Sequence, residues 1–166
     1  MIRKIIKNIK RSIYTERVRR QSQRCGKNLK VNGFSSVTCN TVIRNHVNFN
    51  GMIIEGRGKV IIGNYFHSGK ECLMITHNHN YDKGKAIPYD NTYIFKNIII
   101  GDFVWLGSRV TILPGVNIGE GAIIQGGSVV SSNIPPYAVA GGNPACVFKY
   151  RDIEHFKQLK RDKKFC

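Results

Sequence analysis

Aliphatic residues recur at every sixth position in the C-terminal half of this 166-residue chain. Each of them is followed four residues later by another small or aliphatic residue, and the series consists of Ile100, Leu106, Ile112, Ile118, Ile124 and Val130. Neither an α-helix, with a period of about 3.6, nor a single strand, with a period of about 2, produces this spacing. A chain that turns a corner every six residues does, because the same position then points to the axis on each side of a triangular prism. The pattern predicts an all-β parallel β-helix of hexapeptide repeats.

The repeat is weaker in the preceding residues. It is kept by Val31, Val37, Ile43 and Phe49. Residues 52–66 predict two strands around a Gly-rich turn, and the polar residues 77–97 break the pattern and predict a protruding loop. Glycines 101, 107 and 119 follow inward residues, and we expect them to permit a tight backbone at the corners. The β-helix domain is therefore predicted to cover residues 31–150.

Both ends of the chain have helical periodicity. Isoleucines lie along one face of residues 2–20, so 1–30 is predicted to be a basic N-terminal helical segment. Residues 151–166 predict a short C-terminal helix with Phe156 on its apolar face and Asp152 as N-cap. Because the open end of a solenoid exposes its core, we interpret both helices as caps, and a membrane role for the first helix remains an alternative.

The formal net charge is +16, which indicates anionic partners. Residues 1–30 hold eleven Lys or Arg and one acid, whereas residues 98–147 hold a single Arg and two acids. Nucleic acid is disfavoured, because the basic residues lack the interleaved aromatic residues of single-strand binders.

No segment approaches the roughly 18–20 apolar residues of a membrane span. Five scattered cysteines without a C-x-x-C pair predict free thiols in a reducing cytoplasm.

The candidate chemistry lies in the string T-H-N-H-N-Y-D at residues 76–82. Histidine can take a proton from a hydroxyl group near neutral pH, an effect worth roughly 10²–10⁴ in rate. We expect one of the two imidazoles to face a groove between subunits and the other to face solvent or the neighbouring coil. The alternative is that a polar surface loop simply contains His and Asn.

The string IIIGDFVWLGSRVTILPGVNIGEGAIIQGGSVVSSNIPPYAVAGGNPA resembles the C-terminal coils of the hexapeptide-repeat acetyltransferases. This family includes maltose and galactoside O-acetyltransferases, xenobiotic acetyltransferases and the O-acetyltransferases of surface polysaccharide synthesis. The resemblance covers about residues 60–150 and depends on V-W-L-G-S, L-P-G-V-x-I-G and A-G-G-N-P-A in this order. It implies a left-handed parallel β-helix, a homotrimer, and acetyl-CoA as co-substrate in the groove between adjacent prisms.

The resemblance also implies roles for individual residues. His79 matches the family's catalytic base, because N78-H79-N80-Y81-D82 has both the preceding Asn and the following Asp. His77 is the second choice and would hold or position the substrate. Asp82 and Trp105 are assigned to the substrate site, and packing at a trimer interface is the alternative for the outward Trp105.

The cofactor positions follow in the same way. Those beside the pantetheine arm are matched by Ser108, Gly126 and Ser131, and a basic position near the adenosine 3′-phosphate is matched by Lys149. Where relatives often have Arg, this chain has Cys146, so we expect a second phosphate contact either to be missing or to come from Arg151.

These observations predict an acetyl-CoA-dependent O-acetyltransferase acting on a sugar hydroxyl of a surface polysaccharide or its precursor. We expect a cytoplasmic protein in peripheral contact with the anionic inner face of the membrane, since each cation near such a surface adds about 1 kcal/mol of attraction. An N-acetyltransferase acting on an amino-sugar nucleotide is the main alternative, although 166 residues leave no room for the N-terminal nucleotide-binding domain of many such enzymes. A γ-type carbonic anhydrase using His67, His77 and His79, and a non-catalytic scaffold, are weaker alternatives.

Overall fold

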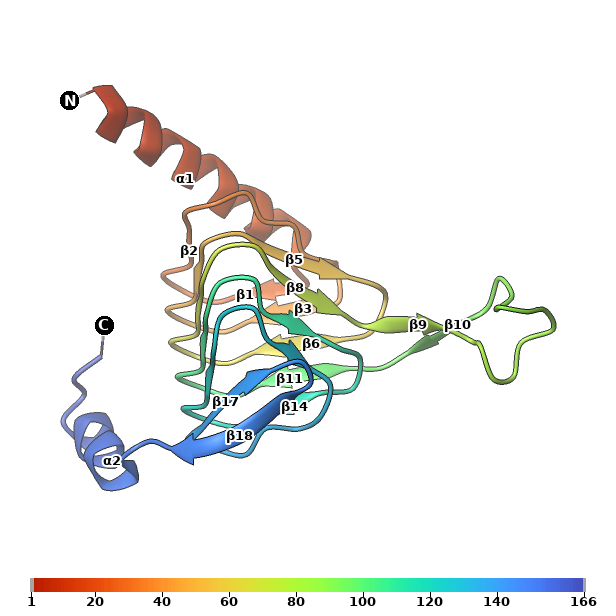
Figure 1. Ribbon diagram of the computed structural model, residues 1–166. Coiled ribbons are helices and arrows are strands. Elements are labelled where there is room, and N and C mark those ends of the chain that lie inside the picture. The colour runs from red at the N-terminus through yellow and green to blue at the C-terminus, as the bar shows by residue number, and fades with distance from the viewer. Residues whose placement is uncertain (1, 166) are drawn as a thin grey trace.

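The computed structural model describes residues 2–165 and consists of a left-handed parallel β-helix with one helix at each end of the chain (Figure 1). Three sheets, parallel except for the last strand of one of them, form the sides of a triangular prism. Sheet A consists of β1 (Arg24–Cys25), β3 (Thr41–Ile43), β6 (Val60–Ile62), β11 (Ile98–Ile100) and β14 (Asn117–Ile118). Sheet B consists of β2 (Lys30–Val31), β4 (Asn48–Phe49), β7 (His67–Ser68), β12 (Trp105–Leu106), β15 (Ile123–Ile124), β17 (Ala138–Gly142) and β18 (Ala145–Tyr150). Sheet C consists of β5 (Met52–Glu55), β8 (Cys72–Ile75), β13 (Thr111–Ile112) and β16 (Val129–Val130).

The register confirms the six-residue period. Ile99 pairs with Asn117 in sheet A, and Trp105 pairs with Ile123 in sheet B, so one coil comprises three hexapeptides. The residues predicted to point to the axis, from Ile100 to Ile134, are all buried. The weaker series from Val31 to Phe49 is buried as well. A continuous aliphatic core therefore runs the length of the prism.

The corner glycines are needed for a different reason from the predicted one. Glycines 101, 107 and 119 do not have a left-handed backbone. Instead, a Cβ added to Gly101 would lie 2.7 Å from the backbone nitrogen of Glu120 on the next coil. Close stacking of successive coils, rather than a tight turn, excludes larger residues there.

A ladder of planar side chains runs along the edge between sheets A and B, which we call the A/B edge. At this corner of successive coils the backbone is left-handed, at Asn28, His46, Tyr65, Phe103, Gly121 and Tyr137. The His46 and Tyr65 ring centroids are 4.5 Å apart, and those of Tyr65 and Phe103 are 5.0 Å apart, with nearly parallel planes in both pairs. Gly121 interrupts this aromatic ladder, because it has no side chain.

Helix α2 (Ile153–Arg161) fills the interruption. Phe156 is buried at Gly121, and its ring lies 5.8 Å from that of Phe103 and 5.2 Å from that of Tyr137. The predicted N-cap is confirmed, since Asp152 Oδ1 accepts a hydrogen bond from the backbone N–H of His155 at 2.9 Å. The helix lies beside the prism, not across its open end (Figure 1).

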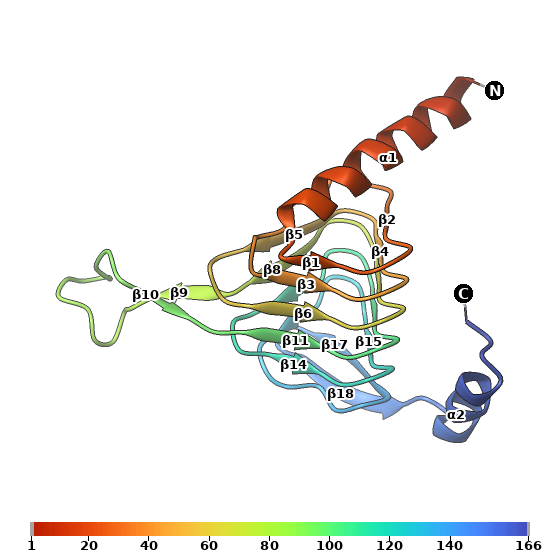
Figure 2. The same cartoon turned by 180° about the vertical axis from the view of Figure 1, so that it is seen from behind.

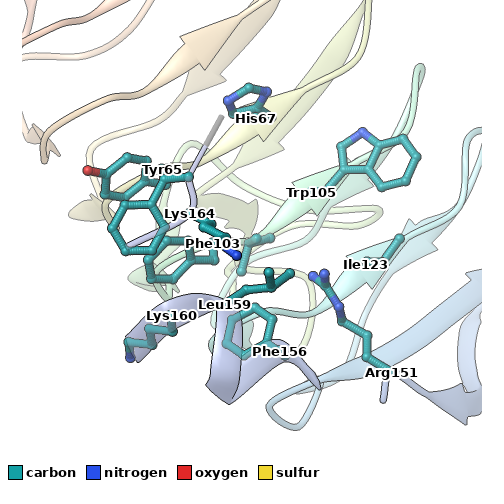
Figure 3. Close-up of a pocket in the computed structure, with 12 residues that line it drawn as sticks. Tyr65, His67, Phe103, Trp105, Ile123, Arg151, Phe156, Leu159, Lys160 and Lys164 are labelled. Carbon is teal, nitrogen blue, oxygen red and sulfur yellow. The ribbon is translucent and has the colours of Figure 1, made fainter. Parts of the chain in front are cut away.

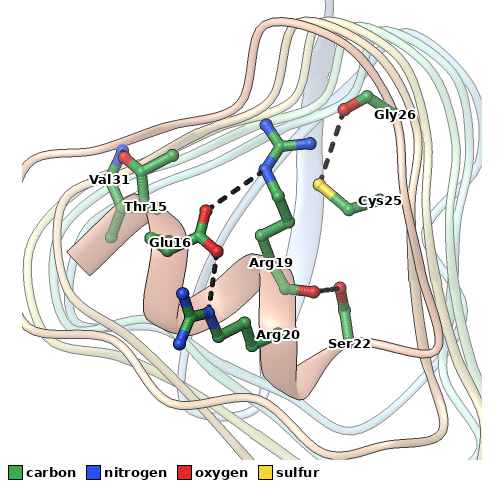
Figure 4. Close-up of polar contacts among 8 residues, drawn as sticks. All are labelled: Thr15, Glu16, Arg19, Arg20, Ser22, Cys25, Gly26 and Val31. Carbon is green, nitrogen blue, oxygen red and sulfur yellow. Dashed lines mark hydrogen bonds and ion pairs between the residues drawn. The ribbon is translucent and has the colours of Figure 1, made fainter. Parts of the chain in front are cut away.

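Helix α1 (Ile2–Gln21) contacts the prism only through its last turns. Val18 is fully buried, and Tyr14 packs partly against the core. The Thr15 Oγ1 atom accepts a hydrogen bond from the backbone N–H of Val31 at 3.1 Å, in the region shown in Figure 4. The rest of the helix projects away from the first coil (Figures 1 and 2). The first strand begins at Arg24, within the segment 1–30 that the sequence assigned to the helix.

The chain leaves the prism after β8 and returns at β11. The protruding segment is an antiparallel hairpin of β9 (His77–His79) and β10 (Tyr93–Phe95), with a loop at its tip (Figure 2). The hairpin starts at the edge between sheets C and A, which we call the C/A edge. Residues 134–145 contain β17, which pairs antiparallel with β18.

Candidate active site

The two histidines lie side by side on one face of the hairpin. His79 pairs with Tyr93 and His77 pairs with Phe95 across the two strands. The rings of both histidines contact Tyr93, with centroid distances of 4.5 Å for His79 and 5.5 Å for His77. The prediction that the imidazoles face different directions is therefore wrong, because residues two apart in a strand share a face.

Aromatic rings and one glycine shape the surroundings of these histidines. Tyr89 stacks on His79 at 3.7 Å between centroids, and Phe95 lies 6.2 Å from His77. On the prism side, a Cβ added to Gly56 would lie 2.5 Å from His77 Nδ1. Gly56 also has a left-handed backbone, so two independent constraints require glycine there.

The Nδ1 atoms of His77 and His79 are buried, and neither has a hydrogen-bond partner among residues 2–165. Leaving a buried polar atom unpaired costs about 1–3 kcal/mol, and most buried polar atoms in folded proteins are paired. A catalytic role is one recognised explanation for a buried polar atom that has no partner within the protein. Asp82 does not supply the missing partner, because it lies exposed in the loop and forms no hydrogen bond with either histidine in the described chain.

Ser108 and Gly126 lie together at a different edge, between sheets B and C, which we call the B/C edge. The Ser108 carbonyl accepts a hydrogen bond from the Gly127 N–H at 2.8 Å, and its Oγ accepts one from the Lys70 N–H at 3.1 Å. A Cβ on Gly126 would lie 3.1 Å from the Ser108 carbonyl oxygen. The side chains at Ser108 and Gly126 are small, so an extended ligand can lie close to the backbone there, next to the ion pair of Arg109 and Glu71 at the same edge.

The remaining cofactor candidates are spread over the molecule. Ser131 follows β16 and is exposed at the C/A edge, and Lys149 is exposed on β18, where it pairs with Val139. Arg151 lies at the A/B edge, where its guanidinium donates to the Gly121 carbonyl at 3.2 Å and lies 4.8 Å from the Phe156 ring. The structure thus brings Ser108 and Gly126 together, but not the other three residues.

Trp105 points outward from sheet B and is 55% exposed, as predicted from its position in the repeat. It lines a cavity of about 750 Å³ between sheet B, the aromatic ladder and α2 (Figure 3). His67, its strand neighbour, also lines this cavity, and burial together with the charge of Lys30 lowers the pKa of that imidazole. The catalytic candidates His77 and His79 are not part of this cavity.

Sequence reasoning missed the aromatic surroundings of the histidines. Tyr89, Tyr93 and Phe95 were treated as ordinary loop residues. Ring side chains occupy alternate positions both in H-N-H at residues 77–79 and in Y-I-F at 93–95. This shared period of two is typical of two paired strands of a hairpin. Within residues 2–165, no group of three His, Cys, Asp or Glu side chains is arranged to hold a metal ion.

Comparison with known proteins finds similar acetyltransferases. Residues 97–132 match the model of the bacterial transferase hexapeptide (six repeats). A hexapeptide-repeat acetyltransferase of Vibrio cholerae, solved with acetyl-CoA, superimposes with a TM-score of 0.69 and 26% identity, covering 80% of this chain and 73% of that one. The chain therefore contains the hexapeptide repeat and resembles hexapeptide-repeat acetyltransferases in sequence and fold.

Other acetyltransferases are similar in structure or in sequence. A maltose O-acetyltransferase from Clostridium difficile superimposes with a TM-score of 0.61 and 28% identity, covering 79% of this chain and 68% of that one. A chloramphenicol acetyltransferase of Klebsiella aerogenes is 34% identical over 56% of this chain and 52% of its own length. The chain spans about half the length of the first curated relatives that it matches.

Proposed function

We propose that this protein is an acetyl-CoA-dependent O-acetyltransferase that modifies a sugar hydroxyl. The observation that carries the proposal is the pair His77 and His79, which share one face of the hairpin and have unpaired Nδ1 atoms among aromatic rings. The hexapeptide repeat at residues 97–132, and the acetyl-CoA bound to the similar Vibrio cholerae acetyltransferase, support the choice of cofactor.

In the proposed reaction, His79 acts as the general base. It takes the proton of the acceptor hydroxyl while that oxygen attacks the carbonyl carbon of the thioester. The carbon–sulfur bond then breaks, and the proton passes from the imidazolium to the leaving thiolate, so the products are an acetyl ester and coenzyme A with a free thiol. His77, beside it, positions the acceptor, and backbone N–H groups stabilise the oxyanion.

The positions of the candidate residues favour a site shared between subunits. The histidines start from the C/A edge, whereas Ser108 and Gly126 lie at the B/C edge, with sheet C between the two edges. We propose a homotrimer in which the hairpin of one copy lies against the B/C edge of the next, with acetyl-CoA along that edge. Ser131 and Lys149 are assigned to the cofactor in the same proposal: Ser131, at the C/A edge, would reach it from the copy that supplies the hairpin, and Lys149 would contact a phosphate.

The acceptor in this proposal is a surface polysaccharide or its precursor. Tyr89 and Tyr93 beside His79 offer apolar ring faces for a sugar, together with polar atoms that can fix its orientation. Asp82 and Trp105 are assigned to acceptor binding. None of the described helices has the length and apolar composition to span a bilayer. We place the protein in the cytoplasm, in peripheral contact with the inner face of the membrane.

The proposal is tested by measuring thiol release from acetyl-CoA with maltose, galactosides, a capsular glycan and UDP-linked amino sugars as acceptors. His79→Ala should reduce turnover by roughly 10²–10⁴, the usual effect of losing a general base. His155→Ala, which removes an exposed imidazole on α2, is the matched control and should leave turnover unchanged.

Two results would overturn parts of the proposal. If His79→Ala kept full activity, the base would be another group. If His77→Ala lost activity while His79→Ala kept it, that group would be His77. Release only with UDP-linked amino sugars would identify an N-acetyltransferase instead.

A further inference from the structure

Helix α1 exposes a continuous stripe of isoleucines. Their exposed fractions are 73% for Ile2, 51% for Ile5, 47% for Ile6, 53% for Ile9 and 59% for Ile13. A stripe of this kind normally faces the core of a soluble protein. Here, nothing within residues 2–165 covers it, although the isoleucines at inward positions of the prism are almost completely buried.

The same helix is strongly basic. Residues 2–21 contain eight Lys or Arg and one acid, Glu16. Glu16 is already engaged within the helix, since its carboxylate lies 2.8 Å from Arg20 Nε and 4.0 Å from Arg19 Nε (Figure 4). Glu16 also lies beyond the isoleucine stripe, so no acidic residue neutralises the five cations at positions 3, 4, 7, 10 and 11.

The attachment of α1 leaves the stripe accessible. Only its C-terminal turns are held, by the buried Val18 and by the Thr15 hydrogen bond to Val31. The turns that bear the isoleucines extend beyond the first coil, away from both the hairpin and α2 (Figures 1 and 2). A large surface can therefore approach the stripe without meeting the prism.

We propose that α1 is an interfacial anchor that inserts its isoleucine stripe into an anionic membrane surface. The isoleucines would lie at the boundary of the acyl chains, and the flanking Lys and Arg would contact lipid phosphates. A helix with an apolar face, a cationic polar face and low net hydrophobicity binds in this way. The inference specifies how the location proposed above is achieved, and it does not depend on acetyl transfer.

A second copy of the chain fits the stripe less well. Ile2, Ile6, Ile9 and Ile13 have the spacing of the a and d positions of a coiled coil, and isoleucine at both positions favours trimers. However, every e position of this segment is then basic, namely Arg3, Lys10 and Arg17. The g positions that would face them in a neighbouring helix contain no acidic residue. Parallel copies would bring these cations together, whereas anionic lipid neutralises them.

Vesicle sedimentation tests the inference. The full chain is mixed, at physiological ionic strength, with vesicles of equal parts phosphatidylcholine and phosphatidylglycerol, and separately with pure phosphatidylcholine. The variant Ile6→Ser/Ile9→Ser removes apolar area without changing charge. Ile99→Ser on sheet A is the matched control, because its 45% exposure is close to that of Ile6.

We expect the wild-type chain and Ile99→Ser to sediment with the anionic vesicles only. The partition coefficient of Ile6→Ser/Ile9→Ser should fall at least about tenfold, because the anchor depends on apolar area as well as charge. Lys4→Gln/Arg11→Gln should also weaken binding, and the remaining binding should respond less to salt.

Three results would overturn the inference: no sedimentation of the wild-type chain, unchanged sedimentation of Ile6→Ser/Ile9→Ser, or a lipid-free oligomer that this variant dissociates. The last result would assign the stripe to a second copy of the chain. Acetyl transfer to a soluble acceptor should be the same in the variant and the wild type, so failure of the anchor and failure of the proposed reaction are distinguishable.

Discussion

The two terminal helices have similar amphipathic patterns but opposite environments. α2 is less than half as long as α1, yet it is held by the buried Phe156 ring, by an N-cap and by an ion pair between Lys160 and Glu120. α1 buries only Val18 and leaves its isoleucines exposed. Apolar periodicity therefore predicts a helix, but it does not say what covers its apolar face. That depends on a complementary surface, which the prism offers to Phe156 of α2 at Gly121 but not to the isoleucines of α1.

The strongest test of this comparison is Phe156→Ala. Removing a buried aromatic ring typically costs about 3 kcal/mol or more, so this change should release α2 and lower the free energy of unfolding by about that amount. Chemical denaturation measures the loss, and limited proteolysis after residue 151 detects the released helix. His155→Ala, at an exposed neighbouring position, should change neither quantity. A loss below about 1 kcal/mol would mean that the aromatic ladder does not hold α2.

The missing side chain at Gly121, which leaves room for Phe156, can be tested separately from the left-handed backbone of this glycine. Gly121 and Gly127 both have positive φ angles, of 68° and 75°. A Cβ on Gly121 would lie 3.0 Å from Tyr137 and 3.1 Å from Phe156, whereas a Cβ on Gly127 would meet nothing within 4 Å. We expect Gly127→Ala to cost about 1 kcal/mol through strain alone, and Gly121→Ala to cost about 1 kcal/mol more because the ring must move.

The thermal midpoints of both variants measure this difference. Equal losses would show that Phe156 adjusts freely to a methyl group, and the gap would then not explain why α2 docks there.

The smallest effect is expected at the other end of the chain. Deleting residues 2–13 removes the exposed isoleucines but keeps Tyr14, Thr15 and Val18, which contact the prism. The free energy of unfolding should therefore change by less than about 0.5 kcal/mol, as for surface changes elsewhere. Denaturation of the truncated chain checks this value. A much larger loss would show that the first turns of α1 do stabilise the prism, and the contrast between the helices would disappear.

The candidate site was only partly predictable. His77 and His79 stood out because two histidines lie next to a break in the repeat, and a polar surface loop was the alternative explanation. The orientation of the two imidazoles was predicted incorrectly. Gly56 was not noticed, because it matters only through its close approach to His77 on the adjacent coil. Lys149 and Ser131 were chosen because they match family positions along the sequence. A sequence match does not show on which edge of the prism a residue lies, so their separation from Ser108 was not predicted.

The sequence by itself determined the prism, its inward residues and the N-cap at Asp152. Each of these follows from a short-range period or a local hydrogen bond, which neighbouring residues specify. Only the tertiary structure decided that α2 docks at Gly121, that α1 remains uncovered, and that Ser108 and the histidines lie on separate edges. These features depend on how residues far apart in the chain meet once the coils have stacked, and no local pattern contains that information.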